Sequence, residues 1–174
     1  MFPTPNISQI LESLGGSSVF SSLDAAQAYH NVSLTARARP LTAFITYLGL
    51  FEFKRMPFGL KNAGATYSRL AQKVKDGIKM KGVEAYLDDV LCHSSDAERH
   101  VQLLRAVFQA HSEHGIVLKA KKTKLFQNQV DFLGFNVSSD GISMKDQYLE
   151  QIKALKENLP TTPKELSSRL GFMG

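Results

Sequence analysis

The chain has 174 residues, of which 43% are hydrophobic, and a formal net charge of +5 at pH 7. This length suits a single domain with a real hydrophobic core, and this composition excludes a disordered or collagen-like chain. No apolar run approaches the roughly 20 residues of a membrane-spanning helix. The single cysteine, Cys92, excludes a disulfide framework and favours an intracellular, reducing compartment, without separating cytoplasm from nucleus. The positive charge favours a polyanionic partner.

The first half of the chain predicts two helices and three strands. Asn6 is placed to cap a short helix that Gly15-Gly16 end. A strand is predicted over 18–23, directly before Asp24, and two more over 43–46 and 51–56. A long helix is predicted over 62–80, because apolar residues recur at helical spacing on one face: Ala63, Tyr67, Leu70, Val74 and Ile78.

The second half alternates hairpins and helices. A hairpin with arms 83–87 and 90–93 is followed by a helix over 96–114 with Ser95 as its cap. The apolar face of that helix is expected to hold Val101, Leu104, Phe108 and His111. Strands over 130–137 and 141–144 are predicted to pair across a turn at 138–141. Helices near 147–158 and after Thr162 follow. This order predicts an α+β domain, with a mainly antiparallel sheet and helices packed on one face.

Two adjacent carboxylates, Asp88 and Asp89, stand between apolar neighbours in Tyr86-Leu87-Asp88-Asp89-Val90. A plain strand would point them to opposite faces, so the chain is expected to turn there. Like charges this close favour a cation between them, and carboxylate oxygens suit Mg²⁺, with Mn²⁺ as the alternative. Together with Asp24 they would form a clamp for phosphoryl transfer. The competing interpretations are a polar turn for the pair and a helix cap for Asp24.

Five segments carry a family resemblance, in the family's order: Ser21–Asp24 continuing to His30, Arg55–Ala63, Tyr86–Asp89, Gly115–Leu118 with Lys122 and Phe126, and Phe132–Phe135. In these segments the chain resembles the palm of a reverse transcriptase of the LTR-retrotransposon (gypsy-like) or retroviral type. Two positions depart from the pattern. Gly64 stands where a proline is usual after Asn-Ala, and Thr123 stands where this group often has cysteine.

The resemblance implies a polymerase palm-like fold and a role for each matching residue. The implied catalytic residues are Asp24, Asp88 and Asp89, which would bind metal together with the carbonyl of Ala25. The implied nucleotide-binding residues are Gln27, Ala28, Tyr29, Phe58, Gly59 and Lys61, and Tyr29 would exclude a ribose 2′-hydroxyl. The implied primer grip comprises Leu133, Gly134 and Phe135, with Lys122. The alternatives are a core tyrosine at 29 and solvated lysines at 61 and 119–124.

The expected function is therefore RNA-directed DNA polymerisation, with a dNTP joined to a primer 3′-hydroxyl on an RNA or DNA template. The alternatives are a retroelement-derived nucleic-acid-binding or scaffold domain without turnover, and a different metal-dependent phosphoryl-transfer enzyme. Residues 1–145 are expected to form the palm with part of the fingers, and 146–174 the truncated start of the thumb. We therefore expect missing fingers, thumb or ribonuclease H partners, weak activity of the chain alone, and self-association.

Overall fold

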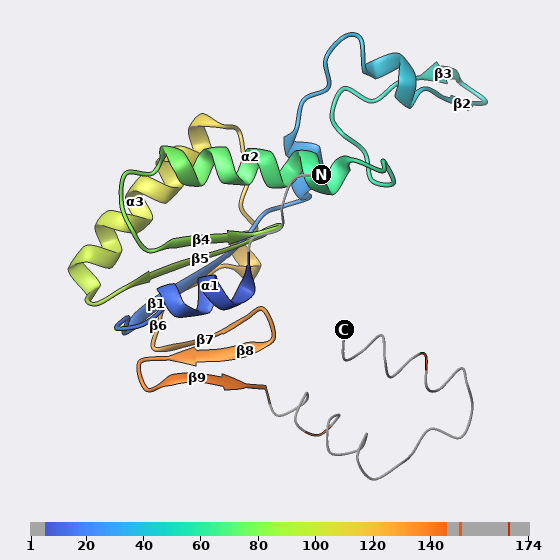
Figure 1. The fold of residues 1–174 in the computed structure, drawn as a ribbon. Helices are drawn as coiled ribbons and strands as arrows, with labels where there is room; N and C mark the ends of the chain where they lie inside the picture. The colour runs from blue at the N-terminus through green and yellow to red at the C-terminus, as the bar shows by residue number, and fades with distance from the viewer. Residues whose placement is uncertain (1–5, 146–149, 151–166, 168–174) are drawn as a thin grey trace.

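The structure is a computed structural model that describes residues 6–145 together with Glu150 and Ser167 (Figure 1). The described helices are α1 (Ile7–Ser13), α2 (Ala63–Gly77) and α3 (Ala97–Glu113), with 3₁₀ turns η1 (Ala28–Asn31), η2 (Arg39–Thr42) and η3 (Ala120–Lys122). The strands are β1 (Val19–Asp24), β2 (Phe44–Thr46), β3 (Gly49–Phe51), β4 (Val83–Tyr86), β5 (Asp89–Ser94), β6 (Lys124–Gln127), β7 (Gln129–Phe132), β8 (Phe135–Ser138) and β9 (Gly141–Met144). The predicted α+β class is confirmed. Apart from Glu150 and Ser167, the helices predicted after residue 146 lie outside the described residues.

The main sheet has the strand order β4-β5-β1-β6, and all its pairs are antiparallel. Strand β5 is buried on both faces, since Val90, Leu91 and Cys92 are consecutive and all buried. Side chains alternate between the faces of a strand, so such a continuous buried run requires a cover on each side of the sheet.

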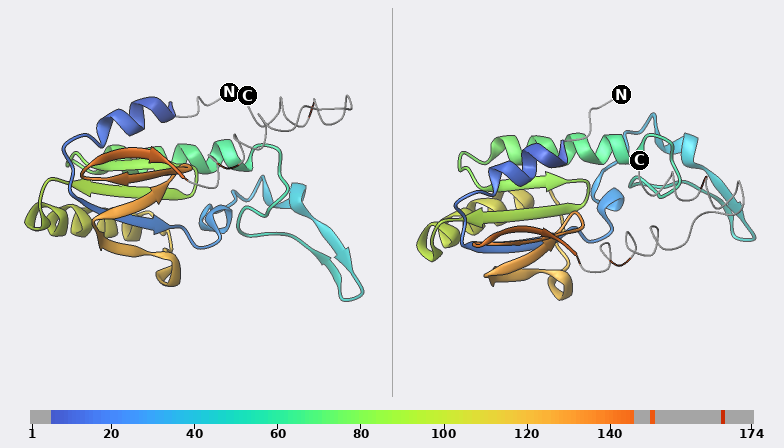
Figure 2. Two further views of the ribbon diagram at one scale, coloured as in Figure 1. Left: turned by 90° about the horizontal axis from the view of Figure 1, so that it is seen from below. Right: turned by 60° about the horizontal axis from the view of Figure 1, so that its bottom comes forward.

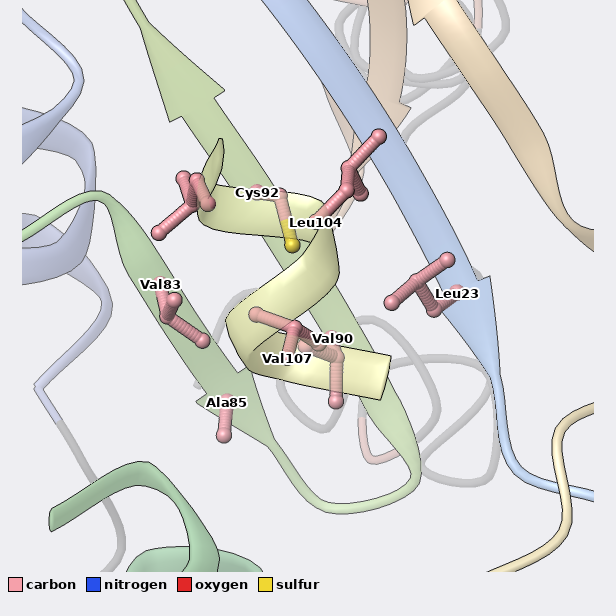
Figure 3. Close-up of a cluster of buried hydrophobic side chains, with 8 residues drawn as sticks. Leu23, Val83, Ala85, Val90, Cys92, Leu104 and Val107 are labelled. Carbon is pink, nitrogen blue, oxygen red and sulfur yellow. The ribbon is translucent and has the colours of Figure 1, made fainter. Parts of the chain in front are cut away.

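Helices α2 and α3 cover one face, as predicted. Figure 3 shows Leu23 of β1, Val83 and Ala85 of β4, and Val90 and Cys92 of β5 around Leu104 and Val107 of α3. The predicted apolar face of α3 is wrong in part, because Val101 and Phe108 are each 40% exposed. The buried stripe instead includes His100, which is tolerated because its two ring nitrogens lie 2.7 Å from Ser21 Oγ and 2.9 Å from Ser94 Oγ.

The helix caps follow local hydrogen bonds. Asn6 caps α1 as predicted, because its side chain accepts the N–H of Ser8. For α3 the predicted cap, Ser95, is wrong. The carboxylate of Asp96 accepts the N–H of Arg99, so α3 begins one residue later.

The opposite face of the main sheet is covered by α1 and by a second sheet, β7-β8-β9 (Figures 1 and 2). The buried residues between them come from all three parts: Ile10, Leu14, Phe20, Leu91, Val130, Phe132 and Val137. The single strand predicted over 130–137 is wrong, because the chain reverses at Leu133-Gly134 with φ of +50° and +87°. Positive φ at both turn residues is what a tight hairpin with this twist requires.

A third sheet, the β2–β3 hairpin, extends away from the main body (Figure 2). The strand predicted over 51–56 is wrong: β3 ends at Phe51, and Arg55 pairs with Ser33 in an isolated bridge. The hairpin exposes large apolar side chains, with Tyr47 at 96% and Leu50 at 73%. An apolar surface of this kind supports the expectation of self-association, which remains a prediction. Within the described part of the chain, no helix is long and apolar enough to cross a membrane.

Candidate active site

The carboxyl end of β1 brings Asp24 next to the two aspartates of the β4–β5 hairpin. Asp24 is the last residue of β1 and lies opposite Asp89, the first residue of β5. The N–H of Ala25 then donates to the carbonyl of Asp88 at 3.3 Å. On the other side, the N–H of Lys119 donates to the carbonyl of Asp24 at 2.8 Å. Backbone hydrogen bonds therefore hold the end of β1 between the hairpin and the segment after α3.

The hairpin turn separates Asp88 from Asp89. Tyr86 pairs with Asp89, which leaves Leu87 and Asp88 as a two-residue turn with φ of +55° at Leu87. The predicted arms 83–87 and 90–93 are thus slightly displaced, because Asp89 already belongs to the strand. Only Asp88 sits at the tip.

Two cavities meet at Asp24. The larger has a volume of about 410 Å³, and Asp24, Asp88 and Tyr29 are among the residues that line it. The smaller has a volume of about 260 Å³ and is lined by Asp24 and Asp89 together with residues of β7. Lys122 also borders both cavities. Asp24 therefore forms part of a wall that the two cavities share.

Lys122 provides positive charge at this wall. Its Nζ lies 3.1 Å from Oδ2 of Asp24, and this hydrogen bond, with the charge of Asp24, raises the pKa of Lys122. The pKa of Asp89 is raised by burial first and then by the charges of Asp88 and Asp24. Burial, followed by the same two charges, raises the pKa of Tyr67 to about 12. Tyr67 is therefore a neutral hydroxyl at neutral pH, and the three carboxylates lie close enough to influence one another.

The donor atoms suit a divalent cation, since carboxylate oxygens are the ligands that Mg²⁺ and Mn²⁺ prefer. Within residues 6–145, however, no three His, Cys, Asp or Glu side chains are grouped as a ready-made metal site. Asp24 shares the larger cavity with Asp88 and the smaller one with Asp89. The convergence of all three carboxylates on one ion remains a prediction.

Four of the six predicted nucleotide-binding residues line the larger cavity: Gln27, Ala28, Tyr29 and Phe58. Ala25, whose carbonyl was predicted to bind metal, lines it too. The ring of Tyr29 packs against those of Phe58 and Tyr67, with centroid distances of 5.3 Å and 6.2 Å. The other two predicted residues do not line this cavity. Gly59 follows Phe58 in a loop, where its φ is +86°, and Lys61 is exposed.

The predicted primer-grip residues lie in two separate places, three of them at the β7–β8 turn and Lys122 beside the carboxylates. Leu133 and Gly134 form the β7–β8 turn and Phe135 begins β8, so they border neither cavity. The preceding residue, Phe132, reaches the smaller cavity. Lys122 lies with the carboxylates rather than with this turn.

Four residues that line the larger cavity were not predicted as site residues: Gly64, Tyr67, Leu87 and Lys119. Tyr67 was assigned to the apolar face of α2, and it is buried as expected. Its phenolic oxygen was the available signal, because a buried tyrosine usually directs its hydroxyl towards a polar partner or a cavity. Gly64 has no side chain from which a place in the site could have been predicted.

Comparisons with known proteins agree with this geometry. Residues 1–137 match the family model described as reverse transcriptase (RNA-dependent DNA polymerase). The chain is 34% identical over 171 residues to a retrovirus-related Pol polyprotein from transposon opus of Drosophila melanogaster, covering 98% of the chain and 17% of that protein. It is 29% identical over 171 residues to a transposon Tf2-3 polyprotein of Schizosaccharomyces pombe, covering 98% of the chain and 13% of that protein.

Solved structures of reverse transcriptases also match this fold. A foamy viral protease-reverse transcriptase in complex with double-stranded DNA superposes with a TM-score of 0.83 at 25% identity, over 97% of this chain and 29% of that one. A foamy viral protease-reverse transcriptase with an RNA/DNA hybrid gives 0.78 at 25% identity, over 98% of this chain and 23% of that one. The chain thus spans less than a third of each of these proteins. It belongs to the reverse transcriptase family, in the form found in retrovirus-related transposons.

Proposed function

We propose that this chain is the palm of an RNA-directed DNA polymerase that adds deoxynucleotides to the 3′-hydroxyl of a primer. One observation carries the proposal: in a chain of this family, Asp24 and Asp88 line one cavity together with Tyr29 and Lys122. The foamy viral relatives were solved with an RNA/DNA hybrid and with double-stranded DNA. By extension, the partner proposed here is an RNA or DNA template paired with a primer, and the narrower gypsy-like origin is part of the same proposal.

Each residue has a proposed task in this reaction. The new bond forms between the primer oxygen and the α-phosphorus of the dNTP, while the bond to pyrophosphate breaks. Asp24 and Asp88, with Asp89 and the carbonyl of Ala25, would hold Mg²⁺ or Mn²⁺. Such a cation, when bound, neutralises phosphate charge and favours ionisation of the primer hydroxyl. Lys122 would balance further phosphate charge, and Tyr29 would contact the sugar.

The arrangement along the chain extends the same proposal. Residues 1–145 would form the palm with part of the fingers, and 146–174 would begin the thumb. Positioning accounts for much of the rate in reactions of this kind, so the 174-residue chain alone is expected to extend primers weakly. A longer polypeptide that includes fingers and thumb is expected to be more active.

The test is single-nucleotide extension of a labelled primer on RNA and DNA templates, first with Mg²⁺ and then with Mn²⁺, using the chain and the longer polypeptide. Asp24→Asn should lower the rate by at least about a hundredfold, the usual order for losing a group that stabilises charge in the transition state. Asp140→Asn removes an exposed carboxylate from the β8–β9 turn and should leave the rate unchanged. Template binding without extension in either polypeptide would favour a scaffold domain without turnover.

A further inference from the structure

Tyr29, the residue proposed to contact the sugar, has no side chain among the described residues packed between its hydroxyl and the backbone of α2 at Gly64. The ring of Tyr29 packs against Phe58 and Tyr67, which restrict its movement towards them. Beside its hydroxyl stands Gly64, the second residue of α2. A Cβ built at Gly64 would lie 3.7 Å from Tyr29 Oη, and no other heavy atom outside its chain neighbours and helix backbone comes within 4 Å.

This geometry leaves room for one methyl group between α2 and the end of Tyr29. Gly64 and Tyr29 both line the larger cavity with Asp24 and Asp88, so the space beside Tyr29 opens into that cavity. A separation of 3.7 Å is an ordinary van der Waals contact, so a methyl group there would touch the hydroxyl without displacing it. The backbone of Gly64 is helical and outside the positive-φ region, so alanine fits without strain.

We propose that Gly64 is a positioning residue that lowers sugar selectivity by leaving Tyr29 free to tilt away from a ribonucleotide. This inference rests on the proposed polymerase function and adds a specificity determinant to it. The extra 2′-hydroxyl of a ribonucleotide needs space where the tyrosine stands. With glycine at 64, the ring gains that space by moving towards α2. With alanine, the methyl group blocks the movement, and the ribonucleotide meets a fixed ring.

The experiment compares kcat/KM for dATP and ATP in single-nucleotide extension by the polypeptide that carries this chain. Gly64→Ala should lower kcat/KM for ATP by about three- to tenfold, below the effect of a direct contact because it acts through Tyr29. The value for dATP should stay within about twofold, since no new group enters the space of a deoxyribose. Equilibrium binding of dATP and ATP, with a primer lacking its 3′-hydroxyl, measures the same preference without turnover.

Two further variants separate this contact from a general effect on the helix. Gly77→Ala makes the same change at the end of α2, where a Cβ would meet nothing within 4 Å. It should leave the dATP/ATP ratio unchanged. In a Tyr29→Phe background the methyl group at 64 has no hydroxyl to touch, so the effect of Gly64→Ala should largely disappear. An equal change in the ratio with Gly77→Ala, or an undiminished one in the Tyr29→Phe background, would overturn the inference.

Tyr29→Ala distinguishes failure of the inference from failure of the proposed function. If Tyr29→Ala raises ATP use while Gly64→Ala changes nothing, Tyr29 reads the sugar and the role of Gly64 is refuted. If Tyr29→Ala leaves the ratio unchanged in an active enzyme, the sugar is read elsewhere and both roles fail. If neither extension nor nucleotide binding is detected in any polypeptide that contains the chain, the polymerase proposal itself fails.

Discussion

Replacing Gly82 by alanine should severely destabilise the hairpin that carries Asp88 and Asp89. Gly82 stands just before β4 with φ of +108°, and a Cβ there would lie 2.2 Å from the carbonyl oxygen of His93 and 3.2 Å from Cδ2 of Leu103. Alanine at such a φ costs about 1–3 kcal/mol. The carbonyl must also move by roughly 1 Å to reach an allowed contact. That movement strains the hydrogen bond from His93 N–H to Gly82 O, which is 2.8 Å long.

The free energy of unfolding, measured by urea denaturation, separates backbone strain from this collision. Gly49→Ala is the matched control, because Gly49 has φ of +124° and a Cβ there would meet nothing within 4 Å. A weakened backbone hydrogen bond costs about 1 kcal/mol. Repacking around the fully buried Leu103 adds about 1–3 kcal/mol. Gly82→Ala should therefore destabilise the chain by about 2–4 kcal/mol more than Gly49→Ala. Equal losses in the two variants would show that the close approach to His93 is absent.

Two further predictions concern charge. The pKa values of His93, His100 and His111 are lowered, each mainly by burial, so the unfolded chain binds more protons as pH falls through about 6.5. The free energy of unfolding should therefore be constant above that pH and decrease below it. If urea denaturation gives the same free energy of unfolding at every pH down to 5, these histidines are not buried as described. Lys122→Met should raise the affinity of the chain for Mn²⁺, measured by electron paramagnetic resonance of the free ion, because Asp24 loses its cationic partner. Lys121→Met, the control at a lysine outside both cavities, should raise the Mn²⁺ affinity less. Equal Mn²⁺ affinities of the two variants would argue against this role of the Lys122–Asp24 ion pair.

The elements that carry the site were predictable because their signals are local. A short strand-like segment ending in Asp24 and a pair of aspartates between apolar arms were enough to predict β1 and the β4–β5 hairpin. The division of Asp88 and Asp89 between two cavities was not predictable. It depends on the register that places Asp24 opposite Asp89, which is set by pairing between distant segments.

Two turns also escaped exact prediction, for a shared reason. Leu87 and Leu133 each begin a hairpin turn with positive φ, at +55° and +50°. Leucine is uncommon in this conformation, and neither residue is a typical turn former. Tertiary packing stabilises the second turn, since Leu133 packs against the cluster beneath α1, whereas Leu87 is 45% exposed. The clearance beside Tyr29 is similarly invisible in sequence, because it depends on where η1 meets α2 in space.

The position of β1 in the main sheet sets the order in which the site can assemble during synthesis. β1 leaves the ribosome well before its partner β5, which lies about 70 residues further on, with Val19 paired to Ser94. On its other edge β1 pairs with β6, where Phe20 lies opposite Gln127, 107 residues further on. At typical translation rates of about 5–20 residues per second, that interval lasts about 5–20 s. During this time the edges of β1 and its apolar side chains lack their native partners, so the nascent chain passes through an aggregation-prone stage before Asp24 can meet Asp88 and Asp89.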